Sequence, residues 1–278
     1  MAVPGGTRMT TVVGVDVSHY QTSEKLASVI RSGAKFVIVK ATQGAASVDT
    51  SHGLHVATGR AGGIPVGHYH FAQAVAAAVA EADFFLATAS PHPGDALALD
   101  LEQMDGSWPA RVAYAVTWLQ HVHARTGAYP LVYMNGSWLS ALTHAATPAQ
   151  LAILRSYPLW IATGGKAPGQ PGVTNWDVHQ YSTAGGIDHD LLAPGVTWAS
   201  FAIPIPKPPA PALTVPLEGD VLRYLIPGSK QQVLILCGKQ TYLNNAAGLS
   251  SVPLSEPDAS TVANYATTFG PIQGTKNP

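Results

Sequence analysis

The stretch ALALDLEQM, residues 96–104, begins as an apolar run that is typical of a buried strand. It ends in two carboxylates, Asp100 and Glu102, one residue apart. Burying a charge is costly unless the charge is paired or used. A lone Asp-x-Glu also fits an ordinary polar strand end, so the rest of the chain has to show whether this pair has a function.

Seven further short apolar runs resemble this one, at residues 11–18, 36–44, 64–71, 129–135, 157–163, 176–182 and, more weakly, 185–192. Helical patterns lie between the early runs, at residues 22–32, 50–61, 72–88 and 109–125. This alternation predicts a parallel sheet with right-handed crossovers, and eight strands suggest closure into a barrel. Because helical patterns become sparse after the fifth strand, we predict an irregular TIM-like (β/α) barrel over residues 11–202, with fewer helices in its second half.

The composition changes after the barrel. Residues 203–216, IPIPKPPAPALTVP, are dense in proline and predict a linker. Residues 217–278 contain short strand-like runs and predict a small C-terminal, mainly-β module. Residues 1–10 predict a flexible N-terminus.

Composition excludes several classes of protein. Of the 278 residues, 46% are hydrophobic and 11% charged, which indicates a globular chain with a large core. The net charge of −1 predicts no nucleic-acid partner. The single cysteine, Cys237, provides neither an internal disulfide nor a metal cluster, and we predict no cofactor and no metal. We read no signal peptide at the N-terminus and expect no insertion into a membrane.

The candidate site residues fall at the strand ends, where (β/α) barrels carry their chemistry. Within a strand, Asp100 and Glu102 project to the same side with Cα atoms about 6.6 Å apart, and such close carboxylates raise one pKa. A raised acid beside an ionised one suits glycosidic cleavage. Asp16 ends the first strand and Asp188 lies in the last, so closure brings four acids to one mouth. The candidate substrate-binding residues at this rim are Tyr69, His70, Tyr133, Trp160, Gln180 and Tyr181. The rings of Tyr69, Tyr133, Trp160 and Tyr181 are suited to stacking on sugars.

At this point the sequence resembles a known family. The segments GVDVSHYQ (14–21), VIVKATQG (37–44), PVGHYHFA (65–72), LDLE (99–102), YMNGSW (133–138), LWIA (159–162), HQYS (179–182) and GGIDHDLL (185–192) follow the order found in glycoside hydrolase family 25, the lysozyme-like N-acetylmuramidases. The resemblance spans about residues 11–200. It implies an irregular barrel of five strand–helix units followed by mainly antiparallel strands.

The resemblance also implies a reaction on peptidoglycan, at the β-1,4 bond between N-acetylmuramic acid and N-acetylglucosamine. Glu102 matches the general acid, and Asp100 the carboxylate that is either the nucleophile or the group that orients the substrate acetamide; both routes retain configuration. Asp16 and Asp188 match two further active-site acids.

Two other functions stay open from sequence alone. A metal-dependent polysaccharide deacetylase would draw its zinc ligands from His68, His70, His19 and the acids. A non-catalytic wall-binding protein would have lost the acids, which this chain retains.

The biology expected from the sequence is that of a phage lysin, because the N-terminal residues lack the pattern of a signal peptide. Such an enzyme passes from the host cytoplasm to the wall after phage-mediated release, or belongs to the virion; a bacterial enzyme with another export route is the alternative. The C-terminal module would bind the cell wall or mediate assembly.

Overall fold

The computed structural model describes residues 12–74, 76–206, 221–225, 233–237, 240–244 and 254–255. The chain divides into two units, residues 1–205 and residues 206–278. The expected flexible N-terminus at residues 1–10 lies outside the described residues. So do residues 207–216 of the expected linker and most of the expected C-terminal module, and the predicted domain boundaries stay predictions.

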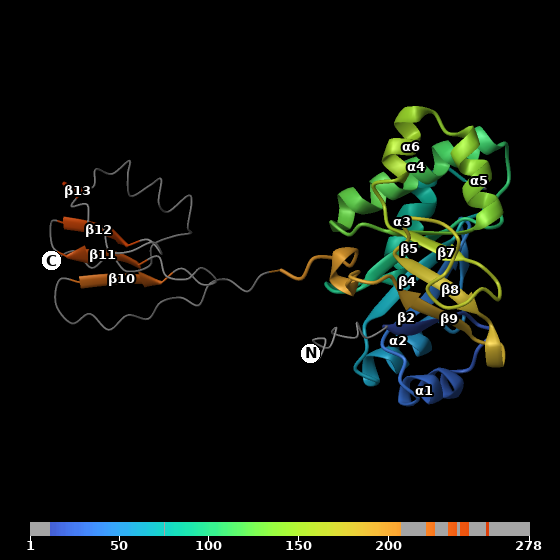
Figure 1. Cartoon of the computed structure of the whole chain (residues 1–278), viewed down its shortest axis with the longest axis horizontal. Coiled ribbons are helices and arrows are strands. Elements are labelled where there is room, and N and C mark those ends of the chain that lie inside the picture. Colours follow the sequence, from blue (N-terminus) through green and yellow to red (C-terminus); the bar gives the residue numbers. More distant parts are fainter. Residues whose placement is uncertain are drawn as a thin grey trace, which may run out of the picture. The chain divides into compact units, whose positions relative to one another are not determined.

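The first unit is a closed barrel (Figure 1). Its strands are β1 (Val13–Val17), β2 (Val37–Gln43), β4 (Val66–Phe71), β5 (Ala96–Asp100), β6 (Leu131–Asn135), β7 (Leu159–Ala162), β8 (Val178–Ser182) and β9 (Asp188–Leu192). Neighbours from β1 through β2 and β4 to β8 pair in parallel, whereas β9 pairs antiparallel with both β8 and β1. The short β3 (Ser47–Val48) adds an antiparallel edge to β2. This mixed barrel confirms the predicted fold class.

The closure occurs where the sequence predicted it, between the first and last strands. Asp16 of β1 and Asp188 of β9 are direct register partners across this seam. The two acids are therefore neighbours in space although 172 positions (188 − 16) separate them in the sequence.

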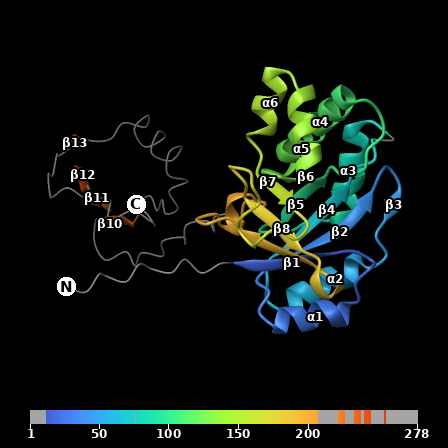
Figure 2. The same cartoon turned by 45° about the vertical axis from the view of Figure 1, so that its right-hand side comes forward.

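Helices flank the barrel on two sides (Figures 1 and 2). The helices α1 (Ser23–Arg31) and α2 (His52–Ala61) lie on one side, and α3 (Ala78–Ala89), α4 (Trp108–Thr126), α5 (Gly136–Ala145) and α6 (Pro148–Leu154) on the other. No helix separates β7 from β8, and only a short 3₁₀ turn, Ala184–Gly186, separates β8 from β9. The expected loss of helices in the second half is thus confirmed, although it begins one strand later than predicted.

Two helices, α5 and α6, were not predicted, yet both carry local start signals. The Asn135 side chain caps α5 by accepting the backbone N–H groups of Ser137 and Trp138. Thr147 and Gln150 form a capping box at α6, with Pro148 at its first turn. By contrast, α3 begins six residues later than predicted, because an unbroken alanine-rich run gives no sequence signal for the first turn.

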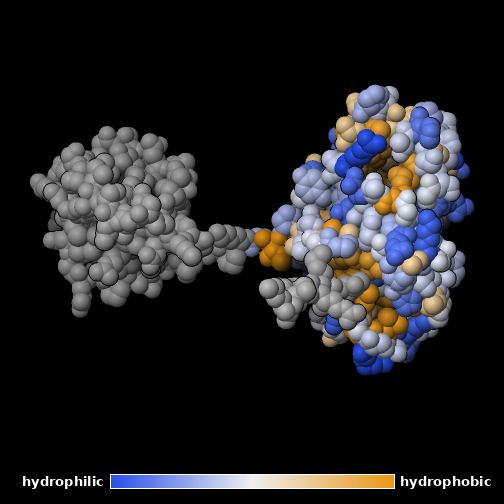
Figure 3. Space-filling model, viewed as in Figure 1, coloured by the Kyte–Doolittle hydropathy of each residue, from blue (hydrophilic) through white to orange (hydrophobic). Residues whose placement is uncertain are grey.

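The apolar core has three parts. One fills the barrel interior, one lies between the sheet and α3–α6, and one lies under α1 and α2. None of the helices in the described ranges is long and apolar enough to span a bilayer. On the face in Figure 3, apolar residues gather in patches among polar ones.

Gly14 of β1 tests the packing of the interior. A Cβ at this position would lie 2.5 Å from ring atoms of Phe36, which is buried in the barrel core. We expect Gly14→Ala to lower the free energy of unfolding by about 1–3 kcal/mol, because the buried ring cannot move aside without strain. Chemical denaturation measures this loss.

The matched control is Gly53→Ala in α2, where a Cβ meets open space. This change should leave stability equal or raise it by about 0.5–1 kcal/mol, because alanine favours a helix more than glycine does. Equal stability of the Gly14→Ala protein and the wild type would contradict the packing described here.

The second unit contains four described strands, β10 (Val221–Leu225), β11 (Val233–Cys237), β12 (Gln240–Asn244) and β13 (Leu254–Ser255). They pair in sequence order as an antiparallel sheet. Their order agrees with the mainly-β character predicted for this segment.

Candidate active site

A small pocket of about 80 Å³ lies at the carboxyl ends of the parallel strands. Its lining consists of eight of the ten predicted site residues, which are Asp16, Tyr69, Asp100, Glu102, Tyr133, Trp160, Gln180 and Asp188. The structure therefore gathers the four acids that lie far apart in the sequence, together with three aromatic rings and one amide.

The strand β5 explains how Asp100 reaches this pocket. Side chains alternate across a strand, and the small residues Ala96 and Ala98 precede Asp100 on the inner side. The strand ends at Asp100, two residues earlier than predicted, and Glu102 lies in the bend that follows. Asp100 is consequently buried, at 6% exposed, whereas Glu102 is exposed at the mouth of the same pocket.

Hydrogen bonds among Tyr133, Gln180 and Asp16 fix one side of the pocket. The Tyr133 hydroxyl donates to Gln180 Oε1 at 3.0 Å, and Gln180 Nε2 donates to Asp16 Oδ2 at 2.7 Å. The Gln180 amide thus holds the Asp16 carboxyl group in place, with Asp16 Oδ2 as the hydrogen-bond acceptor. The Trp160 ring stands edge-on to Tyr133 with centroids 4.7 Å apart, and edge-on to Tyr69 at 6.4 Å. These rings form a rigid apolar wall beside the acids.

The acids perturb one another. Burial, then the negative charge of Asp188, raises the pKa of Asp16 to about 7. Burial, then the charges of Glu102 and Asp16, raises the pKa of Asp100 well above its ordinary value. Loss of hydration also raises the pKa of Glu102, against the opposing effect of Lys40. Shared burial and mutual repulsion therefore favour a proton on at least one of these carboxyl groups, as a general acid requires.

Lys40 is a neighbour of the site that was not among the predicted site residues. It is buried at 8% exposed, lies in β2, and donates from Nζ to Gln43 Oε1 at 2.7 Å, with Nζ 4.4 Å from the centroid of the Phe71 ring. Its positive charge opposes the rise in the pKa values of Asp100 and Glu102 without cancelling it. A lone lysine inside the apolar run VIVKA was the available sequence signal.

Asp190 is the second residue that was missed. It is wholly buried, and its Oδ1 accepts the indole N–H of Trp160 at 2.8 Å. Burial, then the charge of Asp16, raises its pKa well above the ordinary value. The spacing of Asp188 and Asp190 on one strand was the signal, because residues two apart share a face.

Two predicted substrate-binding residues do not line the pocket. His70 follows the inward Tyr69 in β4, so it points to the outer face, where it is wholly buried between Thr42 Oγ1 at 2.8 Å and Glu81 Oε2 at 3.1 Å. Tyr181 follows the inward Gln180 in β8 and packs beside the His179 ring. Both residues lie outside the pocket lining because adjacent residues of a strand face opposite sides, and their role in binding stays a prediction.

The histidines proposed as zinc ligands are engaged elsewhere. His19 Nδ1 pairs with Asp49 at 2.8 Å, and His68 lies between His52 at 2.9 Å and Asp95 at 3.1 Å. Across the residues described, no three His, Cys, Asp or Glu side chains gather in a metal-binding group. The geometry therefore does not favour the deacetylase alternative.

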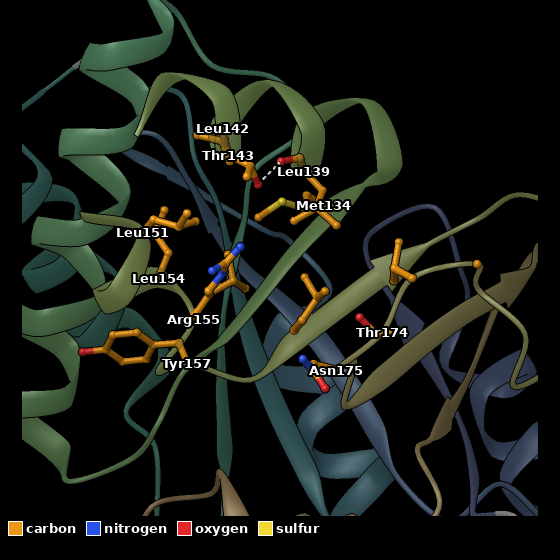
Figure 4. A pocket seen from close by; sticks show the side chains of 14 residues that line it. Met134, Leu139, Leu142, Thr143, Leu151, Leu154, Arg155, Tyr157, Thr174 and Asn175 are labelled. Carbon is orange, nitrogen blue, oxygen red and sulfur yellow. Dashed lines mark hydrogen bonds between the residues drawn. The ribbon is translucent and has the colours of Figure 1, made fainter. Parts of the chain in front are cut away.

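A larger cavity of about 710 Å³ lies elsewhere in the barrel unit (Figure 4). It is lined by residues of β6, β7, α5, α6 and the segment before β8, including Val132 and Met134, which flank the inward Tyr133. Its lining is mostly apolar and includes no carboxylate. It therefore lacks the acid pair that glycosidic cleavage requires.

Comparisons with known proteins agree with this geometry. Residues 15–190 match the family model described as glycosyl hydrolases family 25. The chain is 36% identical over 178 residues to an N,O-diacetylmuramidase of Chalaropsis sp., covering 57% of this chain and 81% of that protein. It is also similar to the structure of a muramidase from Trichobolus zukalii, at 26% identity and a TM-score of 0.59, covering 68% of this chain and 98% of that one.

A bacterial lysozyme from Streptomyces coelicolor shares the fold, with a TM-score of 0.61 at 24% identity, covering 69% of this chain and 97% of that one. The family match covers well over half of the chain, and all four acids of the pocket lie within the matched residues. The chain therefore belongs to glycosyl hydrolases family 25 and is a lysozyme-like glycoside hydrolase.

Proposed function

We propose that the protein is an N-acetylmuramidase that cleaves the β-1,4 bond between N-acetylmuramic acid and N-acetylglucosamine in peptidoglycan, with retention of configuration. The observation that carries the proposal is the convergence of Asp100 and Glu102 with Asp16 and Asp188 in one pocket. The similarity to muramidases supports the choice of substrate.

Glu102 is the proposed general acid. It lies at the exposed mouth, where a leaving sugar can depart, and burial raises its pKa, which favours the protonated form that a general acid needs. In the first step this proton moves to the glycosidic oxygen as the bond from that oxygen to the anomeric carbon breaks. In the second step the Glu102 carboxylate takes a proton from the attacking water.

Asp100 is the proposed partner of the substrate acetamide. Asp100 Oδ1 is buried and has no hydrogen-bond partner among the described groups, so it can accept a hydrogen bond from the substrate. The N–H of an N-acetyl group supplies one. We infer that Asp100 orients the substrate acetamide so that the acetamide oxygen attacks the anomeric carbon. Water then opens the ring that this attack forms. Two displacements at one carbon retain its configuration.

The remaining pocket residues position the substrate. The rings of Tyr69, Tyr133 and Trp160 offer apolar faces and edges to a sugar ring. Asp16 and Asp188 surround the reacting carbon with negative charge, which stabilises the positive charge that develops there.

The bond that is cleaved can be read from the new chain ends. Purified wall is digested with and without a chelator, reduced with borodeuteride and analysed by mass spectrometry. Deuterium on muramitol supports the proposal, and deuterium on glucosaminitol refutes it. Loss of acetate without new chain ends, abolished by the chelator and restored by zinc, would instead identify a deacetylase.

A change at Lys40 should shift the pH profile. The Lys40 cation favours the ionised forms of Asp100 and Glu102, so Lys40→Met should raise both pKa values further. The acid limb requires ionised Asp100 and the alkaline limb requires protonated Glu102, so both limbs should move to higher pH. The measurement is the pH profile of kcat/KM on soluble wall fragments.

Lys35→Met, in the loop before β2, is the control and should leave both limbs in place, because no effect of Lys35 on the pocket acids is found. A pH profile of kcat/KM that moves to lower pH in the Lys40→Met protein would contradict the assigned roles of Asp100 and Glu102.

The route to the wall and the role of residues 206–278 remain proposals. We propose that the C-terminal unit binds the cell wall or mediates assembly, and that release depends on a phage lysis system or on the virion. The antiparallel strands β10–β13 are consistent with a separate module.

A further inference from the structure

Asp190 occupies an unusual place for a carboxylic acid. It is wholly buried in β9, where its register partners are Gly14 of β1 and Gln180 of β8. Its Oδ1 accepts the Trp160 indole N–H, but no N–H or O–H of the described residues reaches its Oδ2. An ionised carboxylate with half of its acceptors unused is costly at such depth.

The surroundings contain negative rather than positive charge. The Asp190 carboxyl lies against that of Asp16, which faces the same side of the seam and already accepts from Gln180. The other titratable groups that interact with Asp190 are Asp188 of β9, Tyr133 of β6 and Tyr181 of β8. Among the described residues, no Lys, Arg or His acts on it.

We propose that Asp190 is a positioning residue that keeps its proton and donates it from Oδ2 to the carboxylate of Asp16, which thereby stays ionised and aimed into the pocket. The assignment of the proton follows from the contacts. Asp16 has the amide of Gln180 as a donor and is 6% exposed, so it is the better place for the charge. Asp190 is sealed at 0% and holds the proton.

The proposal rests on the proposed function only in that Asp16 lines the catalytic pocket. It goes beyond that function by making the neutral state of Asp190 a requirement for an active pocket. Loss of the shared proton at high pH would leave two buried negative charges in contact, and Asp16 would turn away from its position. Burial and the charge of Asp16 both raise the pKa of Asp190, in accordance with this arrangement.

The first test follows the Trp160 indole N–H in full-length protein by ¹⁵N–¹H NMR, with the resonance assigned from Trp160→Phe. Because Trp160 donates to Asp190, its resonance should move in the wild type as the pair loses its proton at alkaline pH. The movement should be absent in Asp190→Asn, whose amide donates to Asp16 at every pH. Asp177→Asn is the matched control, because the Asp177 carboxyl also accepts one N–H, from Leu159 at 2.9 Å, and has a raised pKa.

The second test is stability against pH. A group whose pKa is raised on folding stabilises fully below its unfolded value, about 3.9 for aspartate, and loses that contribution as the pH rises toward the folded value. Asp190→Asn removes this loss. The Tm of the variant should therefore exceed that of the wild type by a margin that widens from acid to neutral pH.

The third test is turnover. Asp190→Asn should keep wild-type turnover at neutral pH, whereas Asp190→Ala, which provides no donor, should lose it. A Trp160 resonance that does not titrate, or a folded Asp190→Asn protein that is inactive at all pH values, would overturn the proposal. Failure of the proposed function would appear separately, as full activity of a Glu102→Gln protein whose Trp160 resonance still titrates.

Discussion

Glu102→Gln should abolish lysis while the protein stays folded. An amide cannot give a proton to the leaving oxygen, so turnover should fall by about 10²–10⁴-fold. The fold should not suffer, because Glu102 lies in an exposed bend and its charge adds to the repulsion on Asp100. The measurement is the rate at which new reducing ends form from soluble wall fragments, with Tm determined on the same samples.

Glu24→Gln is the matched control, because Glu24 is exposed in the first turn of α1 and is not among the residues that line the pocket. It should change neither turnover nor Tm beyond experimental error. Near-normal turnover by a folded Glu102→Gln protein would end the assignment of Glu102 as the acid.

Asp100→Asn should cost about 10²–10³-fold in turnover on ordinary wall, the scale found for a single preorganised electrostatic group. The variant should fold and be more stable than the wild type at neutral pH, because Asp100 is buried with a pKa raised well above its ordinary value. The loss of activity would then come from the chemistry rather than from unfolding.

The substrate acetamide separates the two possible roles of Asp100. If Asp100 orients the acetamide, wall that lacks N-acetyl groups should be a poor substrate for the wild type, and Asp100→Asn should reduce turnover on it little further. An equal loss on N-acetylated and deacetylated wall would show that Asp100 acts without the acetamide, as a covalent nucleophile.

The sequence predicted the barrel well because its parallel strands are continuous apolar runs that end in polar residues. It also predicted that the first and last strands pair, since Asp16 and Asp188 can line one site only if these strands are neighbours. These inferences use period and order, which a sequence displays directly.

Other features depend on three-dimensional contacts. The run HYH at residues 68–70 offers three attractive side chains, but the pleat turns only Tyr69 inward and commits both histidines to buried pairs behind the sheet. Asp190 shows the same limit. Its Oδ1 accepts the indole N–H of Trp160, 30 positions away, and no described donor reaches its Oδ2, and neither feature can be inferred from the sequence. The spacing of Asp188 and Asp190 indicated a shared face, but not a shared proton.

The most direct test of the central claim, that Glu102 and Asp100 act together in a retaining cleavage, is the anomeric configuration of the first product. A soluble glycan fragment is cleaved in an NMR tube, and the anomeric proton of the new reducing end is followed before mutarotation. Retention predicts that the β-anomer appears first and that the α-anomer forms later by mutarotation. An α-anomer that appears first would show inversion by direct attack of water, and would contradict the mechanism assigned to this pair.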